Sequence, residues 1–544
     1  MLPMSTRDFS MVPRPDVPRS TFRLDSTYKT TFDAGYLIPI FCEDVLPGDS
    51  FNVKMSGFAR MATPIFPLMD NLVLDTHFFF VPYRLIWDDS RYFFGEDPDP
   101  ATFPGPTDFL VPRRISSDTV PYAVGSLEDY FGLPTGITPG FGHSALPIRA
   151  YMKIWNEWFR DENLQKAVLV STSSGTDTNT YVLQRRNKRH DYFTSALPWP
   201  QKGNPVSISF AGSQAPVKGI AMTASGIAVA NSPAAYETSG VGNGNSVNYP
   251  FYVNTSLTSA GIIKTTGPAG TQAPFPQIFA DLSAVTAVTI NSLRQAFAIQ
   301  RVLELDARGG TRYTEVVRAH FGVVSPDARL QRPEYLGGGS SPVSISSVTQ
   351  QSATGVTGSS TPIGTVSAVG TILARGHGFA RSFTEHGVII GLASVMSELT
   401  YQQGIRRSWL KRTRFDFYLP SLANLGEQSI YNAEIYMATG AIDPTTQGVF
   451  GYQERWAEYR YSPSMITGLF RSTAAGTLDG WHLSQRFTAL PTLNSAFIQE
   501  DPPMNRVLAV SSSIGKHFLF DVLFRVKAAR PLPMYSVPGL GNRL

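Results

Sequence analysis

The adjacent pair His190 and Asp191 is the first place where residue types and spacing suggest acid-base chemistry. A histidine oriented by a carboxylate is a common general base, and the pair lies in the stretch KRHDYFTSALPWPQKG, residues 188–203. Adjacent side chains on an extended segment point to opposite sides, however, so this spacing does not predict a hydrogen-bonded dyad. We therefore interpret the stretch as architecture, bent by its prolines, and expect no catalytic residue in it.

A run of basic residues surrounds the start of this stretch. It consists of Arg185, Arg186, Lys188 and Arg189. Such a run is most often a solvated face of the protein. The alternative is contact with a neighbouring subunit or a nucleic acid, for which Lys188, Arg189 and Lys202 are the candidates.

Metal ligation is the next chemistry to consider, at His377 and His386 with Glu385 beside the second histidine. No HExxH motif, cysteine pair or EF-hand loop accompanies them, and Cys42 is the single cysteine. The ligand spacings of zinc and calcium sites are therefore missing, and we predict no metal and no cofactor.

The charged run DARGGTRYTEVVRAHFG, residues 306–322, holds acids, arginines and a histidine close together. We interpret it as an ion-paired network that fixes the turn after a helix, in preference to a catalytic cluster. Since no nucleophile elbow, phosphate loop or kinase motif is present either, the sequence does not predict an enzyme.

Two basic stretches have the composition of a contact with single-stranded nucleic acid. The N-terminal arm interleaves cations with prolines, and the stretch IRRSWLKRTRF, residues 405–415, holds a tryptophan and no acid. Cations attract phosphates and aromatic rings stack on unpaired bases, although arginines also make salt bridges between subunits. The candidate residues are Arg7, Arg14, Arg19, Arg23, Arg406, Arg407, Trp409, Lys411, Arg412 and Arg414.

The elements that position these residues are mainly β-strands. Alternating apolar and polar residues predict strands at 51–56, 72–82, 413–420 and 517–527. Strands near both chain ends, separated by several hundred residues, suit a sandwich with long excursions between its strands. Two apolar patterns predict helices packed on this framework, over 290–310 with Asn291 as N-cap and over 149–164.

Two segments are poor in charge and rich in small residues. Residues 211–290 are either disordered or a small β insertion whose exposed apolar residues are covered by partners, and their many β-branched residues favour ordered strands. Residues 337–367, rich in Gly, Ser and Thr, are predicted to form a long surface loop.

The composition of the whole chain favours a folded protein that neighbours cover. Of its 544 residues 12% are aromatic and 16% are charged, and the formal net charge is +4. A charged fraction this low is unusual for a free soluble domain. The N-terminus lacks the apolar run of a signal peptide and no apolar stretch is long enough to span a bilayer, so we expect no membrane insertion.

Several longer stretches closely resemble the major capsid proteins of the microviruses, small icosahedral phages with circular single-stranded DNA. They are GYLIPIFCEDVLPGDSF (35–51), HDYFTSALPWPQKG (190–203), LRQAFAIQRVLELDARGGTRYTEVVRAHFGVVSPDARLQRPEYLGG (293–338), EHGVIIGLASV (385–395) and RPLPMYSVPGL (530–540). The resemblance covers nearly the whole chain outside 211–290, and the position of that insertion resembles the gokushovirus branch.

The resemblance implies an eight-stranded viral jelly roll with long inter-strand loops. Its expected parts are 1–210, an arm and the first part of the jelly roll; 211–290, a protrusion at the three-fold axes; and 291–544, the rest of the jelly roll with a tail. It also implies a T=1 shell around the genome, assembled in the host cytoplasm, with internal scaffolding and minor virion proteins as partners. For contact with a host receptor the candidate residues are Tyr236, Asn243, Tyr249, Phe251 and Tyr252.

A carbohydrate-binding β-sandwich is the alternative of a different class. It would use exposed Trp and Tyr as sugar platforms and would carry a signal peptide, which the sequence does not predict.

Overall fold

The computed structural model describes residues 18–96, 109–116, 121–138, 140–206, 290–352, 363–438, 440, 443–510 and 514–535, and the backbone of six short strands between 217 and 280. The chain divides into two compact units. One combines Met1–Lys202 with Leu305–Leu544, and the other is Gly203–Glu304. The predicted insertion 211–290 lies within the second unit.

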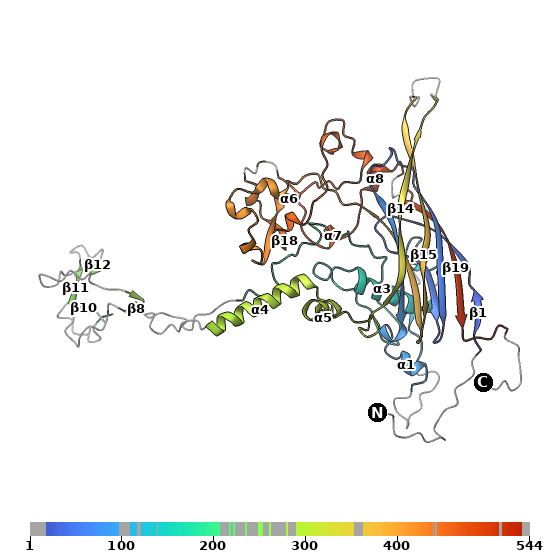
Figure 1. Cartoon of the computed structure of the whole chain (residues 1–544). Coiled ribbons are helices and arrows are strands. Elements are labelled where there is room, and N and C mark those ends of the chain that lie inside the picture. The colour runs from blue at the N-terminus through green and yellow to red at the C-terminus, as the bar shows by residue number, and fades with distance from the viewer. Residues whose placement is uncertain are drawn as a thin grey trace, which may run out of the picture. The chain divides into compact units, whose positions relative to one another are not determined.

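The first unit is an antiparallel jelly roll, as the sequence and the resemblance predict (Figure 1). One row of strands is ordered β2-β19-β4-β15, and the other is ordered β14-β5-β16-β3. The short strand β1 pairs with β19 beside β2. The strands are β1 (Ser20–Arg23), β2 (Ser26–Phe32), β3 (Ile38–Val45), β4 (Ser50–Met61), β5 (Leu72–Pro82), β14 (Glu334–Thr349), β15 (Val366–Ser382), β16 (Gly387–Ser397) and β19 (Phe518–Arg530).

The two rows of strands enclose one apolar core. On β19 and β4 buried and exposed residues alternate along the strand, which is the period-two pattern that predicts them. Phe524 of β19 faces the opposite row, with its ring centroid 5.0 Å from that of Phe41 on β3 and 6.5 Å from that of Phe78 on β5. The strand β14 joins the rows, because its first half pairs with β5 and its second half with β15.

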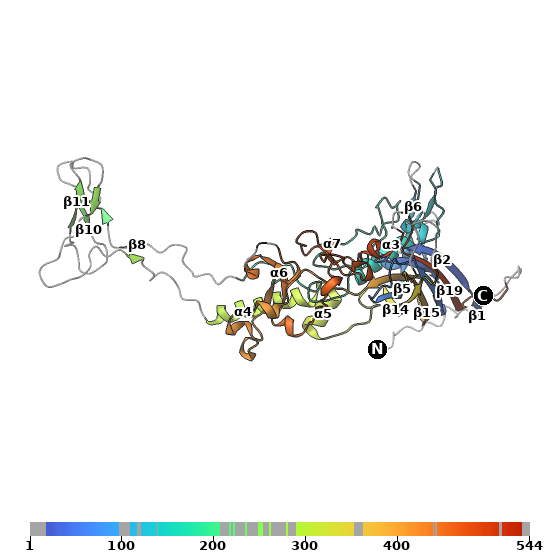
Figure 2. The ribbon, with the colours of Figure 1, turned by 90° about the horizontal axis from the view of Figure 1, so that it is seen from above.

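In the row that contains β5 and β16, all of β16 and most of β5 are buried on both faces. Helix α3 (Leu146–Ile154), extended by a π-helical turn at Trp155–Phe159, packs on its outer side and confirms the helix predicted there (Figure 2). Its side chains form a second core with Phe79 of β5 and Ile390 of β16. This double burial explains why β16 reads as a continuous apolar run.

The predicted surface loop over 337–367 is wrong for residues 337–349 and 366–367, which belong to the long strands β14 and β15. Glycines occupy β14 where neighbours approach closely. A Cβ atom on Gly338 would lie 2.0 Å from the carbonyl oxygen of Thr76, and one on Gly339 would lie 2.4 Å from the ring of His377. Glycine therefore marks close packing here and not a loop. Residues 353–362 lie outside the part of the chain that the structure describes.

The predicted strand over 413–420 is also wrong. Two 3-10 turns, Arg414–Asp416 and Pro420–Leu422, occupy this segment. The Asp416 carboxylate accepts hydrogen bonds from the backbone N–H of Thr413, at 2.6 Å, and of Arg412, at 3.0 Å. An aspartate that bonds its own preceding backbone favours a turn over a strand, and it leaves Phe415 and Phe417 exposed.

Helix α4 (Ile290–Gly309) confirms the other predicted helix, with two differences. Asn291 lies inside the helix and does not cap it, and Ala307 is its one buried residue. Phe297, on its apolar side, is 65% exposed, and the predicted packing of this helix on the β framework stays a prediction. A further helix, α5 (Tyr313–Phe321), follows it and was not predicted.

The remaining elements are short. In the first unit they are α1 (Ser90–Phe93), α2 (Leu127–Tyr130), α6 (Asn432–Ile435), α7 (Ser495–Ile498), α8 (Met504–Val507), and the strand pairs β6 (Arg113–Ile115) with β7 (Gly142–Ser144) and β17 (Glu427–Tyr431) with β18 (Val449–Glu454). The second unit contains β8 (Val217–Lys218), β9 (Ala221–Met222), β10 (Ala234–Tyr236), β11 (Asn248–Val253), β12 (Ala260–Ile262) and β13 (Phe279–Ala280). No helix among the described residues is long and apolar enough to cross a membrane.

Candidate functional site

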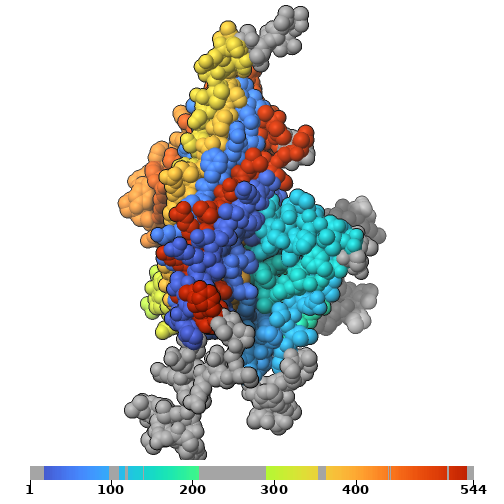
Figure 3. Space-filling view, turned by 90° about the vertical axis from the view of Figure 1, so that its right-hand side faces the viewer, coloured from blue at the N-terminus to red at the C-terminus, as the bar shows by residue number. Residues whose placement is uncertain are grey.

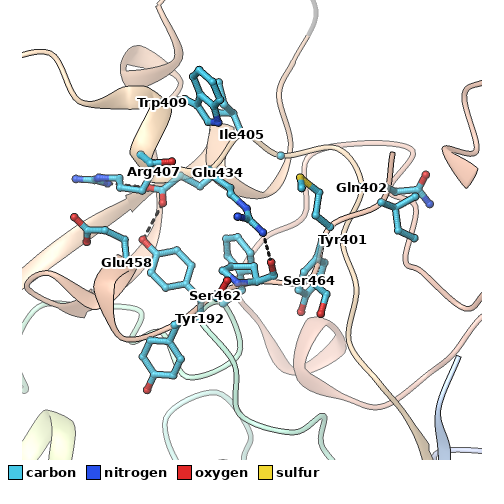
Figure 4. Close-up of a pocket in the computed structure, with 18 of the residues that line it drawn as sticks. Tyr192, Tyr401, Gln402, Ile405, Arg407, Trp409, Glu434, Glu458, Ser462 and Ser464 are labelled. Carbon is cyan, nitrogen blue, oxygen red and sulfur yellow. Dashed lines mark hydrogen bonds and ion pairs between the residues drawn. The ribbon is translucent and has the colours of Figure 1, made fainter. Parts of the chain in front are cut away.

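The first part of the basic stretch, residues 405–409 with Lys411, lines a cavity of about 590 Å³ in the first unit (Figure 4). A 3-10 turn at Arg407–Leu410 places Arg406, Arg407, Trp409 and Lys411 along this cavity. Aromatic side chains from distant parts of the chain complete the wall, namely Tyr192, Phe193, Tyr401, Tyr459 and Tyr461. The cations and aromatic rings predicted from sequence are thus brought together.

Two of these cations are neutralised inside the protein. The Arg407 guanidinium lies 2.7 Å from one carboxylate oxygen of Glu434. The other oxygen of this carboxylate accepts a hydrogen bond from the Tyr192 hydroxyl at 2.8 Å. Burial raises the pKa of the Glu434 carboxyl above its usual value, although the nearby Arg407 guanidinium acts in the opposite direction and lowers this pKa. Lys411 pairs with Glu458 at 3.5 Å and donates to the Tyr459 hydroxyl. These two side chains therefore hold the cavity wall together, and little of their charge remains for an outside ligand.

The other members of this stretch are exposed. Arg406 donates to the carbonyl oxygen of Pro463 at 3.0 Å, and Arg412 makes a surface ion pair with Asp443 at 3.1 Å. Arg414 is exposed, and the Trp409 ring is 77% exposed. This part of the stretch keeps the capacity to bind phosphate or to stack on a base.

The N-terminal candidates lie partly on the sheet and partly outside the described residues. Arg7 and Arg14 fall outside them. Arg19 donates to the carbonyl oxygen of Gly48 and, at 3.2 Å, to the Ser50 hydroxyl. Arg23 is exposed on β1. The part of the arm that is described is therefore an edge of the sheet.

The pair His190 and Asp191 is architectural. One carboxylate oxygen of Asp191 accepts hydrogen bonds from the backbone N–H of Phe193 at 2.9 Å and of Thr194 at 2.7 Å, which closes the turn that follows. His190 is exposed. The carboxylate is thus used by its own backbone and does not orient the imidazole.

The interpretation of residues 185–189 as a solvated face is wrong for most of the run. Lys188 is buried, and its ammonium group donates to Gln485 at 2.9 Å and to the carbonyl oxygen of Phe497 at 2.6 Å. Burial lowers its pKa to about 8. Arg186 pairs with Asp75 at 2.7 Å. Partners more than a hundred residues away draw these cations inside, and Lys188 is not free to meet a neighbour or a nucleic acid.

His377 and His386 do not share a site. The buried His377 ring lies 2.8 Å from the Thr76 hydroxyl and 3.0 Å from the Ser341 hydroxyl, which ties β15 to β5 and β14. The His386 ring stacks on Phe94, with 3.7 Å between the centroids. In the parts of the chain that are described, no cluster of three or more His, Cys, Asp or Glu could hold a metal ion.

The run 306–322 forms the predicted ion pairs. The Arg312 guanidinium pairs with Glu162 at 2.7 Å and with Glu315 at 3.1 Å, and His320 lies 2.8 Å from Asp306. This network fixes the connection between α4 and α5.

The candidates chosen from sequence miss the cations on the strands themselves. The outward positions of β4 and β19 carry Lys54, Arg60, Arg525 and Lys527, all of which are exposed. A signal was present, since these residues occupy the polar positions of the two alternating patterns. From the sequence alone, polar positions of this kind indicate only which side of each strand faces solvent.

The host-contact candidates cannot be placed as side chains. Tyr236 belongs to β10, and Tyr249, Phe251 and Tyr252 belong to β11, but their side chains lie outside the described residues. Asn243 lies outside them entirely.

Comparison with known proteins gives the family. A sequence profile described as "Capsid protein (F protein)" matches residues 10–540. "Capsid protein VP1" of Chlamydia phage 1 is 44% identical over 98% of this chain and 97% of its own length. Proteins of the same name from Bdellovibrio phage phiMH2K, at 40% over 98% of both chains, and Spiroplasma virus 4, at 36% over 98% of this chain and 97% of its own, also match. The chain therefore belongs to the capsid protein (F protein) family of the microviruses, in its gokushovirus branch.

Proposed function

We propose that the chain assembles into a T=1 icosahedral shell that encloses a circular single-stranded DNA genome. Exposed large apolar side chains on the excursions from the jelly roll carry this proposal. Examples are Tyr313 at 74%, Phe321 at 76%, Val324 at 79% and Trp409 at 77% exposure. Apolar groups concentrated on a surface mark contacts with other molecules, and closed symmetry lets one chain cover them with copies of itself.

Electron microscopy of the purified protein tests assembly. The expected result is closed icosahedral particles of uniform size, in infected cells and under at least one set of assembly conditions in vitro. Sedimentation would then show a single large species together with free subunits. Monomers alone under every condition, including in infected cells, would overturn the proposal.

For genome contact, the proposal retains the residues chosen from sequence. Arg407 and Lys411 contribute indirectly: they hold the cavity wall together, because they are ion-paired with Glu434 and Glu458. The residues proposed for direct contact are Arg7, Arg14, Arg19, Arg23, Arg406, Trp409, Arg412 and Arg414. Cations and aromatic rings suit sequence-independent binding of single strands.

Residues 211–290 are proposed as the protrusion at the three-fold axes that contacts a host receptor, through Tyr236, Asn243, Tyr249, Phe251 and Tyr252. The observation that supports this is the placement of the segment in a compact unit of its own, Gly203–Glu304. A unit with separate internal packing can be removed with little effect on the fold of the rest.

Deletion of residues 211–290 is expected to abolish adsorption to host cells while particles still form. The physical reason is that the jelly-roll core draws its residues from outside this segment. Cell-bound particles are counted after mixing, and particle yield is measured in parallel. A deletion variant that adsorbs like the wild type contradicts the receptor assignment, and loss of particles together with adsorption contradicts the independence of the segment.

The remaining parts of the proposal concern partners and place. The chain works as a structural protein without catalytic turnover, and it meets internal scaffolding and minor virion proteins during assembly in the host cytoplasm. It ends in the virion and does not insert into a membrane. These statements rest on membership of the capsid family.

A further inference from the structure

One face of the sheet has a concentration of cations that form no ion pair with the residues the structure describes. Figure 3 looks onto the side of the molecule where β2, β4, β15 and β19 lie next to one another at the surface. The outward positions of these strands and of β1 hold seven exposed cations and one exposed acid, Asp521. The cations are Arg23, Lys29, Lys54, Arg60, Arg375, Arg525 and Lys527. We call this surface the outer sheet face.

The described part of the chain supplies no ion pair to any of the seven. By contrast, several arginines elsewhere in the protein are tied to carboxylates, as Arg149 is to Asp177 and Arg186 is to Asp75. Among the described residues, Asp521 lies directly across the strands from Lys29, and Asp25 and Asp129 lie at the margin of the outer sheet face. Positive charge therefore remains in clear excess.

The register places like charges next to each other. Arg525 of β19 is the cross-strand partner of Lys54 on β4, and Lys527 is the cross-strand partner of Arg23 on β1. Like charges directly opposite each other destabilise a pair of strands. The arrangement therefore lowers the stability of the sheet slightly, and a multivalent anion that follows the strands would recover that stability.

The same face offers a surface for an unpaired base. A hollow of about 720 Å³ opens over β2, β4 and β19, with Lys29 and Arg60 among its lining residues. Phe58 and Leu519 line it too, although both point out of the core and are 50% and 54% exposed. An aromatic ring beside a row of cations is the combination that holds single-stranded nucleic acid.

We propose that the outer sheet face binds the phosphodiester backbone of single-stranded DNA, with a base stacked on Phe58. This inference rests on the proposed function, since it names the surface of the subunit that meets the enclosed genome. An acidic protein segment would also match the charge. The aromatic hollow among the cations favours nucleic acid over such a segment.

Three triple variants test the proposal, and each removes three positive charges. The first is Lys54→Gln, Arg525→Gln and Lys527→Gln on the outer sheet face. The matched control is Lys166→Gln, Arg318→Gln and Arg329→Gln, which are exposed cations away from this face. The third is Arg406→Gln, Arg412→Gln and Arg414→Gln, from the stretch chosen by sequence.

Two measurements are made on each variant. Binding of an oligothymidylate to the unassembled protein is titrated at several salt concentrations, and DNA mass per particle is determined for purified particles. The outer-face variant is expected to bind about tenfold or more weakly at low salt, with a salt slope smaller by about 2, since each lost phosphate contact on a single strand contributes about 0.7. DNA mass per particle falls, and the control variant matches the wild type.

A fourth variant, Phe58→Leu, tests the base contact without changing charge. It keeps an apolar side chain of similar size and is expected to weaken oligothymidylate binding about fivefold with an unchanged salt slope. Equal binding by wild type, outer-face and Phe58→Leu proteins would overturn the inference.

Other outcomes distinguish a failure of this inference from a failure of the proposed shell function. If the wild type forms no particles at all, the proposed shell function fails and oligonucleotide binding still reports on the face. If the outer-face variant loses particles while its oligonucleotide binding is unchanged, the face contacts protein, and the inference is wrong. If only the triple at 406, 412 and 414 loses binding, the genome contact lies along the stretch 405–415 and again the inference is wrong.

Discussion

Replacement of Arg149 by methionine is expected to lower the free energy of unfolding by about 3–5 kcal/mol. Arg149 and Asp177 form an ion pair at 2.7 Å in which both side chains are 0% exposed. The guanidinium also donates to the carbonyl oxygens of Ile86 at 3.2 Å and Ser173 at 3.0 Å, so it joins α3 to two loops. Without it, the Asp177 carboxylate remains buried without a counter-charge. Urea denaturation of the unassembled protein measures the change.

A second variant separates the buried charge from lost packing. Arg149→Met combined with Asp177→Asn leaves no buried charge and should recover part of the lost stability. The surface counterpart is Arg412→Met. The ion pair between Arg412 and Asp443 is exposed, so losing this pair should leave the urea midpoint unchanged. A similar midpoint for Arg149→Met and Arg412→Met would show that the buried pair does not stabilise the fold.

Phe524→Ala is expected to destabilise the protein by a similar amount, about 3–5 kcal/mol. The ring of Phe524 is 1% exposed and contacts both Phe41 and Phe78 on the opposite row of strands. Its removal leaves a cavity between the two rows, which the sandwich cannot fill without moving a strand. The loss is measured by urea denaturation and, in parallel, as a lower yield of soluble protein.

Phe58→Ala is the matched control for this substitution. Phe58 lies on the neighbouring strand β4 of the same row but points outward and is half exposed. Its truncation removes the same atoms without opening a core cavity, so the loss of stability should be much smaller. Equal losses for the two variants would mean that the rows are not held together through Phe524.

Alternation identified β19 and the first half of β4, because their inward positions are large and apolar while their outward ones are mostly polar. β5 was predicted over its full length, although most positions on both of its faces are buried. β14 was missed because its glycines lack the side chains that would show a period. The close neighbours that require those glycines, Thr76 and His377, come from strands far away in sequence.

The candidate site was predicted only in part for a similar reason. Composition correctly pointed to Arg406, Arg407, Trp409 and Lys411, which line one cavity. It could not show that Glu434 and Glu458 neutralise Arg407 and Lys411. The same limit applies to Lys188, whose partners Gln485 and Phe497 are about three hundred residues away. Whether a cation is free depends on acids and carbonyl groups that only the fold brings near.

The pairing of β19 with β2 and β4 has a consequence for how the protein is made. Phe518 is the cross-strand partner of Phe32 and of Met61, so the centre of one row is supplied by residues near the two ends of the chain. Translation of a chain this long takes on the order of a minute. During that time β2 and β4 lack the strand that separates them and keep unpaired edges. The subunit can close only after the ribosome has released its last strand, and a prematurely terminated chain cannot enter the shell.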